Sequence, residues 1–328
     1  MRSLLLTCYT LRASSLISRK LELPCRQMNP SESGYWYLAS YPKSGNTWCR
    51  IFITELQRLS DDNQSKKQLD LNEDIKKTGV IASSRHWLDD QLGINSCDLS
   101  FGELDPLRGR AGESNLIFEE SERFHKVHDA FTSPDSKHRP VVSVMNCKGV
   151  VYISRHPEDV AVSLSHYYDL SVSKCVQTLI DSDAALLPMD HAGDHQVRQH
   201  MGRWDQHVNS WLDQTCLPIL SIRYEDMLTD SFSTFSSLVQ FLELPSDPVL
   251  INKAIKNTSI GKLQELETEV GGFRAKPKTC QKFFRSGRSG EGAEQLSIQQ
   301  RHLLFSVLEN GMKRLGYEGP SNTAEEMI

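Results

Sequence analysis

The sequence lacks an apolar run as long as the roughly 18 residues that a membrane span needs, and no such span is predicted. It has no excess of one charge either: 37 Lys and Arg against 42 Asp and Glu give a formal net charge of −5. That balance gives no reason to expect binding to nucleic acid or to a membrane surface. Its eight cysteines form no CxxC pair. Scattered thiols are typical of a reducing compartment, so we expect a soluble, cytoplasmic protein.

The 328 residues are enough for one large α/β domain or two small ones. Residues 1–28 are basic and rich in Ser and Leu, with no acidic residue before Glu22, as in organelle transit peptides. Met28 stands just before the first predicted strand, so an upstream extension is the other interpretation. We expect residues 1–28 to be an N-terminal extension outside the fold, 29–320 to form one domain and 321–328 to be a tail.

The segment WYLASYPKSGNTWCR, residues 36–50, predicts a strand, a tight loop and the start of a helix. The apolar run stops at Pro42, and the next five residues are polar or small. Trp48, Ile51, Phe52 and Leu56 then follow at helical spacing. Such a loop gathers free backbone N–H groups at the positive end of a helix, which favours binding of a phosphate.

The strand–helix pattern recurs along the chain. Residues 150–153 are a continuous apolar run, typical of a buried parallel strand, and Pro157 suits the first position of a helix. Residues 217–227 predict a third strand, followed by helices that open near Asp230 and Ser297. Residues 60–78 and 95–115 are interpreted as mainly connecting segments. The alternation predicts a single α/β domain with a central parallel β-sheet flanked by α-helices, a three-layer architecture like that of P-loop kinases.

The phosphate loop is not a P-loop of the form G-x-x-x-x-G-K-[ST], because Lys43 precedes Gly45 and no glycine stands at the required distance. No strand-end Asp for magnesium is obvious. A ligand that resembles phosphate but needs no metal fits better.

Several motifs together resemble the sulfotransferases that use 3′-phosphoadenosine 5′-phosphosulfate (PAPS). YPKSGNTW resembles their 5′-phosphosulfate loop, with Asn46 where the family has Thr. ISRHPEDVAVSLSHYY, FHKVHDAF, RYEDM, NTSI and FFRSGRSGEG resemble further family segments in the same order. The resemblance covers residues 35–317 and implies a sulfotransferase that moves a sulfonyl group from PAPS, as co-substrate, to a hydroxyl or amine of a small-molecule acceptor.

The resemblance also implies roles for individual residues. His128 would be the base, Lys43 would stabilise the leaving nucleotide, and Lys126 would stabilise the sulfonyl oxygens. Ser163 would bind the 3′-phosphate and hold Lys43 between turnovers. The full set of implied PAPS-binding residues is Lys43, Ser44, Gly45, Asn46, Thr47, Trp48, Arg155, Ser163, Tyr224, Thr258, Arg285, Ser286 and Gly287.

Two departures from the family pattern lie near the C-terminus. Gly290-Glu291-Gly292 stands where the family has Gly-Asp-Trp, so an aromatic packing contact is absent. AEQLSIQQRH lacks the Lys and Glu ends of the family's dimer motif, which leaves a homodimer possible but unsupported. The acceptor pocket would be formed by residues 79–115 and 170–200, whose composition favours a small or moderately polar hydroxyl compound.

Two alternatives for the function remain open. The chain could be a small-molecule kinase that uses Mg-ATP, or a catalytically silent nucleotide-binding protein of the same fold. His191 and His195, four residues apart, could share a helix face and bind a metal, but Gly193 weakens that helix and no Cys or acidic partner follows at ligand spacing. We therefore expect no metal site.

Overall fold

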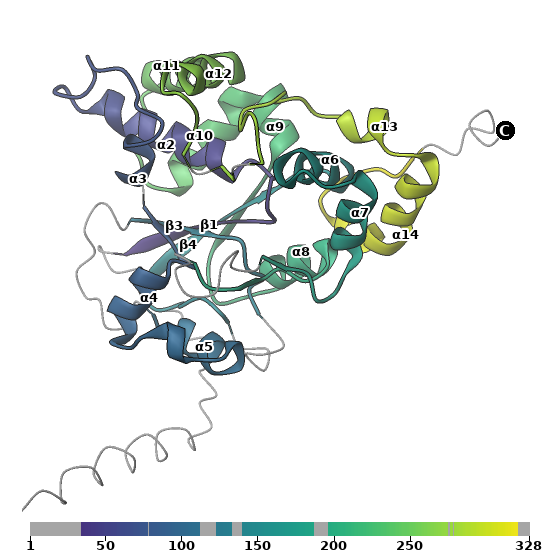
Figure 1. Ribbon diagram of the computed structural model, residues 1–328. Helices are drawn as coiled ribbons and strands as arrows, with labels where there is room; N and C mark the ends of the chain where they lie inside the picture. The colour runs from purple at the N-terminus through teal and green to yellow at the C-terminus, as the bar shows by residue number, and fades with distance from the viewer. Residues whose placement is uncertain are drawn as a thin grey trace, which may run out of the picture.

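The computed structural model describes residues 34–77, 79–111, 123–132, 140–186, 196–274, 276–277 and 279–320. The predicted extension and tail lie outside these ranges, so the domain boundaries stay a prediction. A five-stranded parallel sheet has the order β2-β3-β1-β4-β7 (Figure 1). Its strands are β1 Tyr35–Ser40, β2 Val80–Ile81, β3 Phe124–Val127, β4 Cys147–Ser154 and β7 Ile219–Arg223. The predicted fold class is confirmed.

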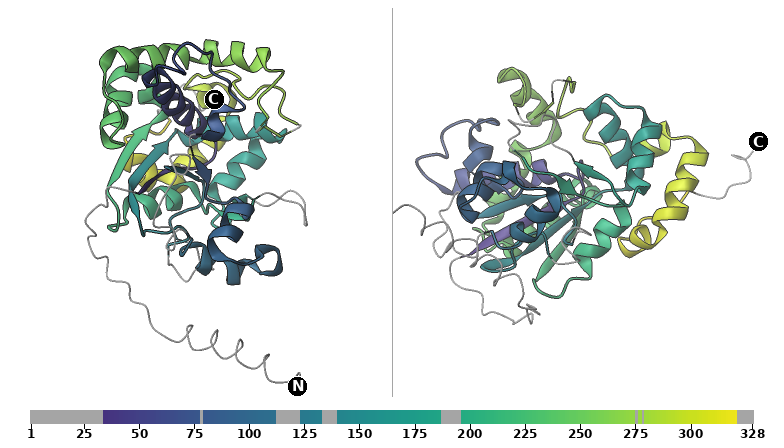
Figure 2. Two further views of the ribbon diagram at one scale, coloured as in Figure 1. Left: turned by 90° about the vertical axis from the view of Figure 1, so that its left-hand side faces the viewer. Right: turned by 60° about the horizontal axis from the view of Figure 1, so that its bottom comes forward.

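Helices form a layer on each face of the sheet (Figures 1 and 2). The described helices are α2 Asn46–Ser60, α3 Asp74–Lys77, α4 Arg85–Leu92, α5 Phe101–Arg108, α6 Pro157–Tyr168, α7 Val172–Ile180, α8 Trp204–Leu212, α9 Tyr224–Thr229, α10 Ser231–Phe241, α11 Pro248–Asn257, α12 Ile260–Glu269, α13 Glu291–Gln295 and α14 Ile298–Arg314. A 3₁₀ turn, Ser96–Asp98, and a two-stranded ribbon of β5 Ala185–Leu186 and β6 Gln199–His200 complete the fold.

Strand β1 shows why the core strands are apolar along their whole length. Successive side chains of a strand point to opposite faces. Trp36 and Leu38 enter the core formed with α2, α10 and α11, whereas Tyr37 and Ala39 enter the core formed with α6, α7, α8 and α14. All six residues of β1 are buried, so its position at the centre of the sheet follows from the sequence.

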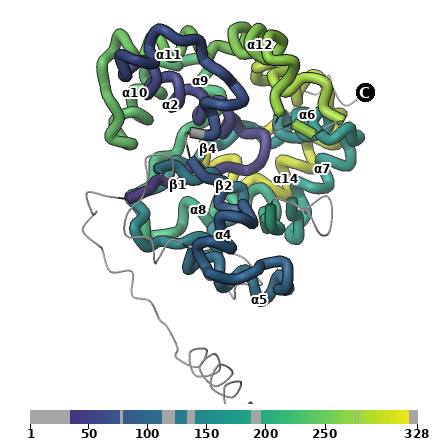
Figure 3. The backbone as a smooth tube through the Cα atoms, turned by 60° about the vertical axis from the view of Figure 1, so that its left-hand side comes forward, coloured from purple at the N-terminus to yellow at the C-terminus, as the bar shows by residue number. Residues whose placement is uncertain are grey.

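Helices α4 and α5 lie together on one side of the sheet, away from the layer formed by α2, α10 and α11 (Figures 1 and 3). They share a small apolar cluster of Leu88, Leu104, Ala111 and Val197. The prediction that residues 95–115 are a connecting segment is therefore wrong for Phe101–Arg108, where a Ser100 capping box starts helix α5. The predicted third strand is also too long, because β7 ends at Arg223 and Tyr224 begins α9.

Among the described residues, no helix combines the length and the apolar composition that crossing a membrane requires.

Candidate active site

The predicted site residues meet at one edge of the sheet because its strands are parallel and their carboxyl ends lie together. The loop with Lys43 follows β1, and His128 directly follows β3. Arg155 follows β4, and Tyr224 follows β7. Segments far apart in the sequence thus converge on one place.

The loop after β1 has a backbone that few residues can adopt. Lys43 has φ 68° and Gly45 has φ 105°, and a Cβ on Gly45 would lie 2.7 Å from Cδ2 of Tyr224. The turn lets α2 begin at once, and its first helical bond runs from the Cys49 N–H to the Gly45 carbonyl, at 3.1 Å. The N–H groups at the start of α2 therefore have no helical acceptor, as expected of an anion site.

Ser44 and Asn46, two polar residues of this loop, differ in the hydrogen bonds that their side chains make within the protein. Ser44 Oγ is buried and has no hydrogen-bond partner among the described residues. Asn46 Nδ2, in contrast, donates to the Leu38 carbonyl at 2.8 Å and to Ser40 Oγ at 3.3 Å. The Asn46 amide nitrogen thus holds the loop against β1, whereas Asn46 Oδ1 is buried with no partner among the described residues.

The imidazole of His128 has a defined proton position. It is 9% exposed, and its Nδ1 lies 2.8 Å from the Ser40 carbonyl oxygen. A carbonyl can only accept, so Nδ1 carries the proton and Nε2 carries the lone pair. Burial, with the charge of Lys126 as the second cause, lowers the pKa of His128 well below its ordinary value. The ring is a neutral base near pH 7.

The two predicted lysines are less basic than usual. Burial, reinforced by the charges of Arg155 and Arg285, lowers the pKa of Lys43 to about 8. Burial also lowers the pKa of Lys126 to about 7, with the charges of Arg50 and Lys43 adding to the shift. These like charges repel one another, so a bound anion would favour the protonated form of each lysine.

The Lys43 ammonium lies against aromatic rings in this structure. Nζ is 3.8 Å from the ring centroid of Tyr167 and 4.6 Å from that of Phe283, distances at which a cation is attracted to a ring face. Within the described residues no hydrogen bond joins Lys43 to Ser163. The predicted tether is therefore absent here, and the binding of the 3′-phosphate by Ser163 stays a prediction.

Arg155 connects the loop after β1 to the segment 280–292, which we call the lid. Its guanidinium donates to the Lys43 carbonyl at 3.4 Å and to the Arg288 carbonyl at 2.9 Å. It also lies 4.4 Å from the ring centroid of Tyr224. Its Nε is buried with no partner among the described residues, so a donor remains for a ligand.

The lid brings two predicted residues to a carboxylate. Arg285 and Ser286 both donate to Glu291, at distances between 2.6 and 3.0 Å. The third, Gly287, has φ 62°. Thr258 is buried and donates its hydroxyl proton to the Ala254 carbonyl at 2.8 Å, so towards a ligand its hydroxyl can only accept.

Four residues that shape the site carry no clear functional signal in the sequence. Tyr167 and Phe283 hold Lys43, and Asp159 and Glu291 hold the lid. Of the four, Glu291 lies in a segment that departs from the family pattern, where Gly290-Glu291-Gly292 stands in place of Gly-Asp-Trp. Arg50 is a further such residue, a buried cation that donates to the Ile75 carbonyl at 3.2 Å.

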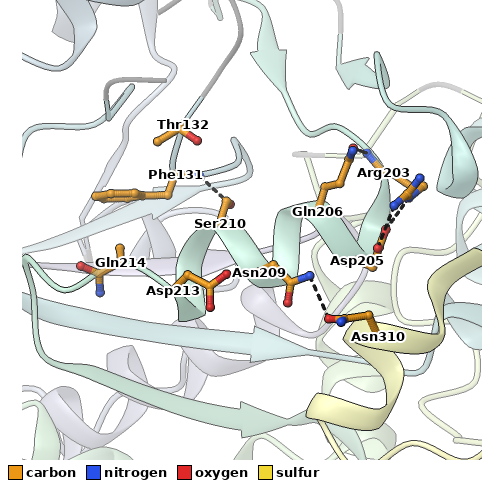
Figure 4. Close-up of a pocket in the computed structure, with 10 residues that line it drawn as sticks. All are labelled: Phe131, Thr132, Arg203, Asp205, Gln206, Asn209, Ser210, Asp213, Gln214 and Asn310. Atoms are coloured by element: carbon orange, nitrogen blue, oxygen red, sulfur yellow. Dashed lines mark hydrogen bonds and ion pairs between the residues drawn. The ribbon is translucent and has the colours of Figure 1, made fainter. Parts of the chain in front are cut away.

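The acceptor side is only partly described. His191 and His195 lie outside the described residues, and within those that are described no group of three His, Cys, Asp or Glu side chains could hold a metal. A hollow of about 660 Å³ lies along α8 and is lined by Phe131, Thr132, Arg203, Asp205, Gln206, Asn209, Ser210, Asp213, Gln214 and Asn310 (Figure 4). None of the predicted site residues lines it.

The central parallel sheet, with helices on both faces, defines an α/β protein of the three-layer class. The model of the sulfotransferase domain matches residues 36–316. The chain therefore belongs to the sulfotransferase family, which confirms the resemblance and the prediction of an enzyme of the PAPS-dependent class.

Curated relatives agree with this assignment, and a solved structure has a similar fold. Sulfotransferase 1E1 of Bos taurus is 28% identical over 84% of this chain and 82% of its own length. Cytosolic sulfotransferase 1 of Arabidopsis thaliana is 24% identical over 84% of this chain and 78% of its own. The crystal structure of mouse sulfotransferase SULT7A1 complexed with PAP superposes with a TM-score of 0.55 at 19% identity, covering 86% of this chain and 85% of that one.

Proposed function

We propose that the protein transfers the sulfonyl group of PAPS to a hydroxyl, or an amine, of a small-molecule acceptor. The observation that carries this proposal is the fixed tautomer of His128 beside two cations. Nδ1 is bound to the Ser40 carbonyl at 2.8 Å, so Nε2 is free to take the acceptor's proton. Family membership supports the reaction class, and the mouse structure holds PAP, the product that PAPS leaves behind.

In the proposed reaction His128, Lys43 and Lys126 have the roles that the family resemblance implies. The acceptor oxygen attacks sulfur as its proton passes to His128 Nε2, and the bond from sulfur to the bridging oxygen of the nucleotide breaks. Negative charge then develops on that oxygen, where the ammonium of Lys43 stabilises it. Lys126 stabilises the sulfonyl oxygens during the transfer.

The residues of the site fit the donor nucleotide. Ser44 Oγ and Arg155 Nε are buried without a partner among the described residues, as expected of groups that bind a ligand. The N–H groups at the start of α2 suit the 5′-phosphosulfate, and Arg155 with Ser163 and the lid suits the 3′-phosphate. Tyr224 and Thr258 would contact the nucleotide base.

The acceptor is proposed only as a class. Retinol dehydratase, a structural neighbour with a TM-score of 0.56 at 17% identity, was solved with retinol and PAP. A small or moderately polar hydroxyl compound remains our proposal here. Relatives named cytosolic support a cytoplasmic location, while a homodimer remains possible without support from the dimer motif.

The test is transfer of labelled sulfonate from PAPS to a panel of phenols, alcohols, amines and sugars. We expect labelled product, undiminished by a chelator, because lysines would supply the positive charge that magnesium supplies in kinases. Phosphate transfer from ATP that stops in chelator and returns with magnesium would instead establish the kinase. Absence of any transfer, with PAP still bound, would indicate a catalytically silent protein.

A further inference from the structure

The lid is folded around one buried carboxylate. Glu291 is 2% exposed and accepts hydrogen bonds from Arg285 NH1 at 3.0 Å and NH2 at 2.6 Å. Ser286 Oγ donates to it at 2.7 Å, and Arg288 NH2 lies at 3.5 Å. These bonds close the backbone between Arg285 and Glu291 into a compact loop. Because the Ser286 hydroxyl donates its hydrogen bond to Glu291, the donor that Ser286 can offer to a ligand is its backbone N–H.

Two further carboxylates fix the ends of this loop. Glu267 accepts from the backbone N–H groups of Phe283 and Phe284, at 2.9 and 3.1 Å. Asp159 accepts from those of Gly290 and Gly292, at 2.9 and 2.8 Å. Between these anchors, the backbone N–H groups of residues 285–289 have no acceptor within the described structure. A run of free N–H groups held in a turn is a typical binding site for an anionic oxygen.

The free N–H groups of residues 285–289 lie next to the Arg155 guanidinium. Arg155 NH2 donates to the Arg288 carbonyl at 2.9 Å, and Arg155 is 3.8 Å from Asp159. Residues 285–289 and the Arg155 guanidinium therefore form one site with positive character. Gly287 is required at the turn, because a Cβ there would lie 2.4 Å from Cγ1 of Ile260.

The presence of Gly292 where the family has Trp has a steric reason. A Cβ on Gly292 would lie 2.3 Å from Cβ of Glu158, so α13 reaches the first turn of α6 only because residue 292 has no side chain. An aromatic residue at that position is incompatible with this packing. The contacts of Glu291 and Asp159 hold the lid in its place.

We propose that Glu291 is a positioning residue for the 3′-phosphate: it folds residues 285–289 into the anion-binding loop and thereby sets the preference for a 3′-phosphorylated nucleotide. This inference rests on the proposed function. The charge of Glu291 is balanced by the guanidinium groups of Arg285 and Arg288. Loss of the carboxylate removes the acceptor that Arg285 and Ser286 share, and so loosens the loop.

The test compares Glu291→Gln with Glu294→Gln, a matched control on the same helix whose exposed carboxylate contacts Arg288 alone among the described residues. Titration calorimetry measures binding of 3′-phosphoadenosine 5′-phosphate (PAP) and of AMP, which lacks the 3′-phosphate. We expect E291Q to bind PAP about tenfold more weakly, with AMP affinity unchanged, and E294Q to match the wild type for both. A merely structural role would weaken both nucleotides together.

Amide hydrogen exchange on the wild-type protein tests the same inference without a variant. Residues 285–289 should gain protection with PAP but not with AMP. Tight PAP binding by E291Q, equal to or above that of the wild type, overturns the inference and leaves the proposed function intact. If E291Q does not fold, Glu291→Asp replaces it, with the same PAP-specific loss expected. A wild-type protein that does not prefer PAP over AMP overturns the proposed function itself.

Discussion

At the scale of single residues, His128 and Lys43 are expected to act on different partners. His128 is held by the Ser40 carbonyl, with Nε2 available to an acceptor. Lys43 belongs to the loop that starts α2, where the nucleotide is expected. The two side chains should therefore be separable by experiment, although both serve the same reaction.

Replacing either residue by Ala should lower kcat, since a positioned base contributes roughly 10²- to 10⁴-fold. His128→Ala should still bind PAP with nearly wild-type affinity, whereas Lys43→Ala should bind it more weakly. Single-turnover kinetics and PAP titration measure the two effects. A fully active His128→Ala enzyme would show that the base has been assigned wrongly.

The lowered pKa values of the lysines predict proton uptake on nucleotide binding. The pKa of Lys43 is about 8 and that of Lys126 about 7, so at pH 8 both are partly neutral in the free protein. A bound anion favours the charged form and raises both pKa values. Calorimetric titration with PAP at pH 8, in buffers of different ionisation enthalpy, should show protons taken up from solution; release of protons would contradict the assignment.

At the scale of elements, the turn between β1 and α2 limits which residues can form the site. Gly45 has φ 105° and Tyr224 occupies the space a side chain would need. Gly45→Ala should lower the free energy of unfolding by about 1–3 kcal/mol and should abolish PAP binding, because the N–H groups at the start of α2 move.

Gly93→Ala is the matched control for that substitution. Gly93 also has positive φ, 64°, but a Cβ there meets nothing within 4 Å. It ends α4, away from the loop. Urea denaturation and PAP titration should show a loss of stability alone for Gly93→Ala. Equal PAP affinity in the two variants would mean that the turn does not position the ligand.

At the scale of the whole molecule, buried neutral histidines make stability depend on pH. His207 is fully buried, and burial lowers its pKa to about 3. Its Nε2 donates to the His128 carbonyl at 3.2 Å, and its Nδ1 accepts from the Tyr152 hydroxyl at 2.9 Å. The ring therefore joins α8 to the end of β3 and the middle of β4, next to the candidate base.

The sign of the effect follows from linkage. Below pH 6.5 the unfolded chain protonates His207 and His128 while the folded chain does not, so stability falls as the pH falls. For His207 alone the loss between pH 6.5 and 5 should be about 2 kcal/mol. Urea denaturation across this range should show a shallower slope for His207→Asn than for the wild type. His166→Asn, at an exposed position, should keep the wild-type slope.

The fold class and the family can be predicted from local patterns in the amino-acid sequence. Strands buried on both faces must be apolar throughout, and the turn at residues 41–47 admits few residues, so both leave local patterns in the sequence. Helix α14 is predicted from Ser297 and from the helical spacing of the apolar residues after it, and the structure adds a capping box of Ser297 with Gln300 at its start. Phe101–Arg108 escaped prediction because its Gly, Asp and Pro content is typical of a loop.

The way in which the site residues are held depends on contacts between segments that are distant in the sequence. The tautomer of His128 depends on a carbonyl 88 positions away in the chain, at Ser40. The lowered pKa of Lys43 depends on burial beneath segments distant in sequence. The position of the lid depends on a hydrogen bond from the Gly290 N–H to Asp159, which lies 131 positions earlier in the chain. Burial, hydrogen bonding and charge act through space between distant segments, so no local pattern in the sequence records them.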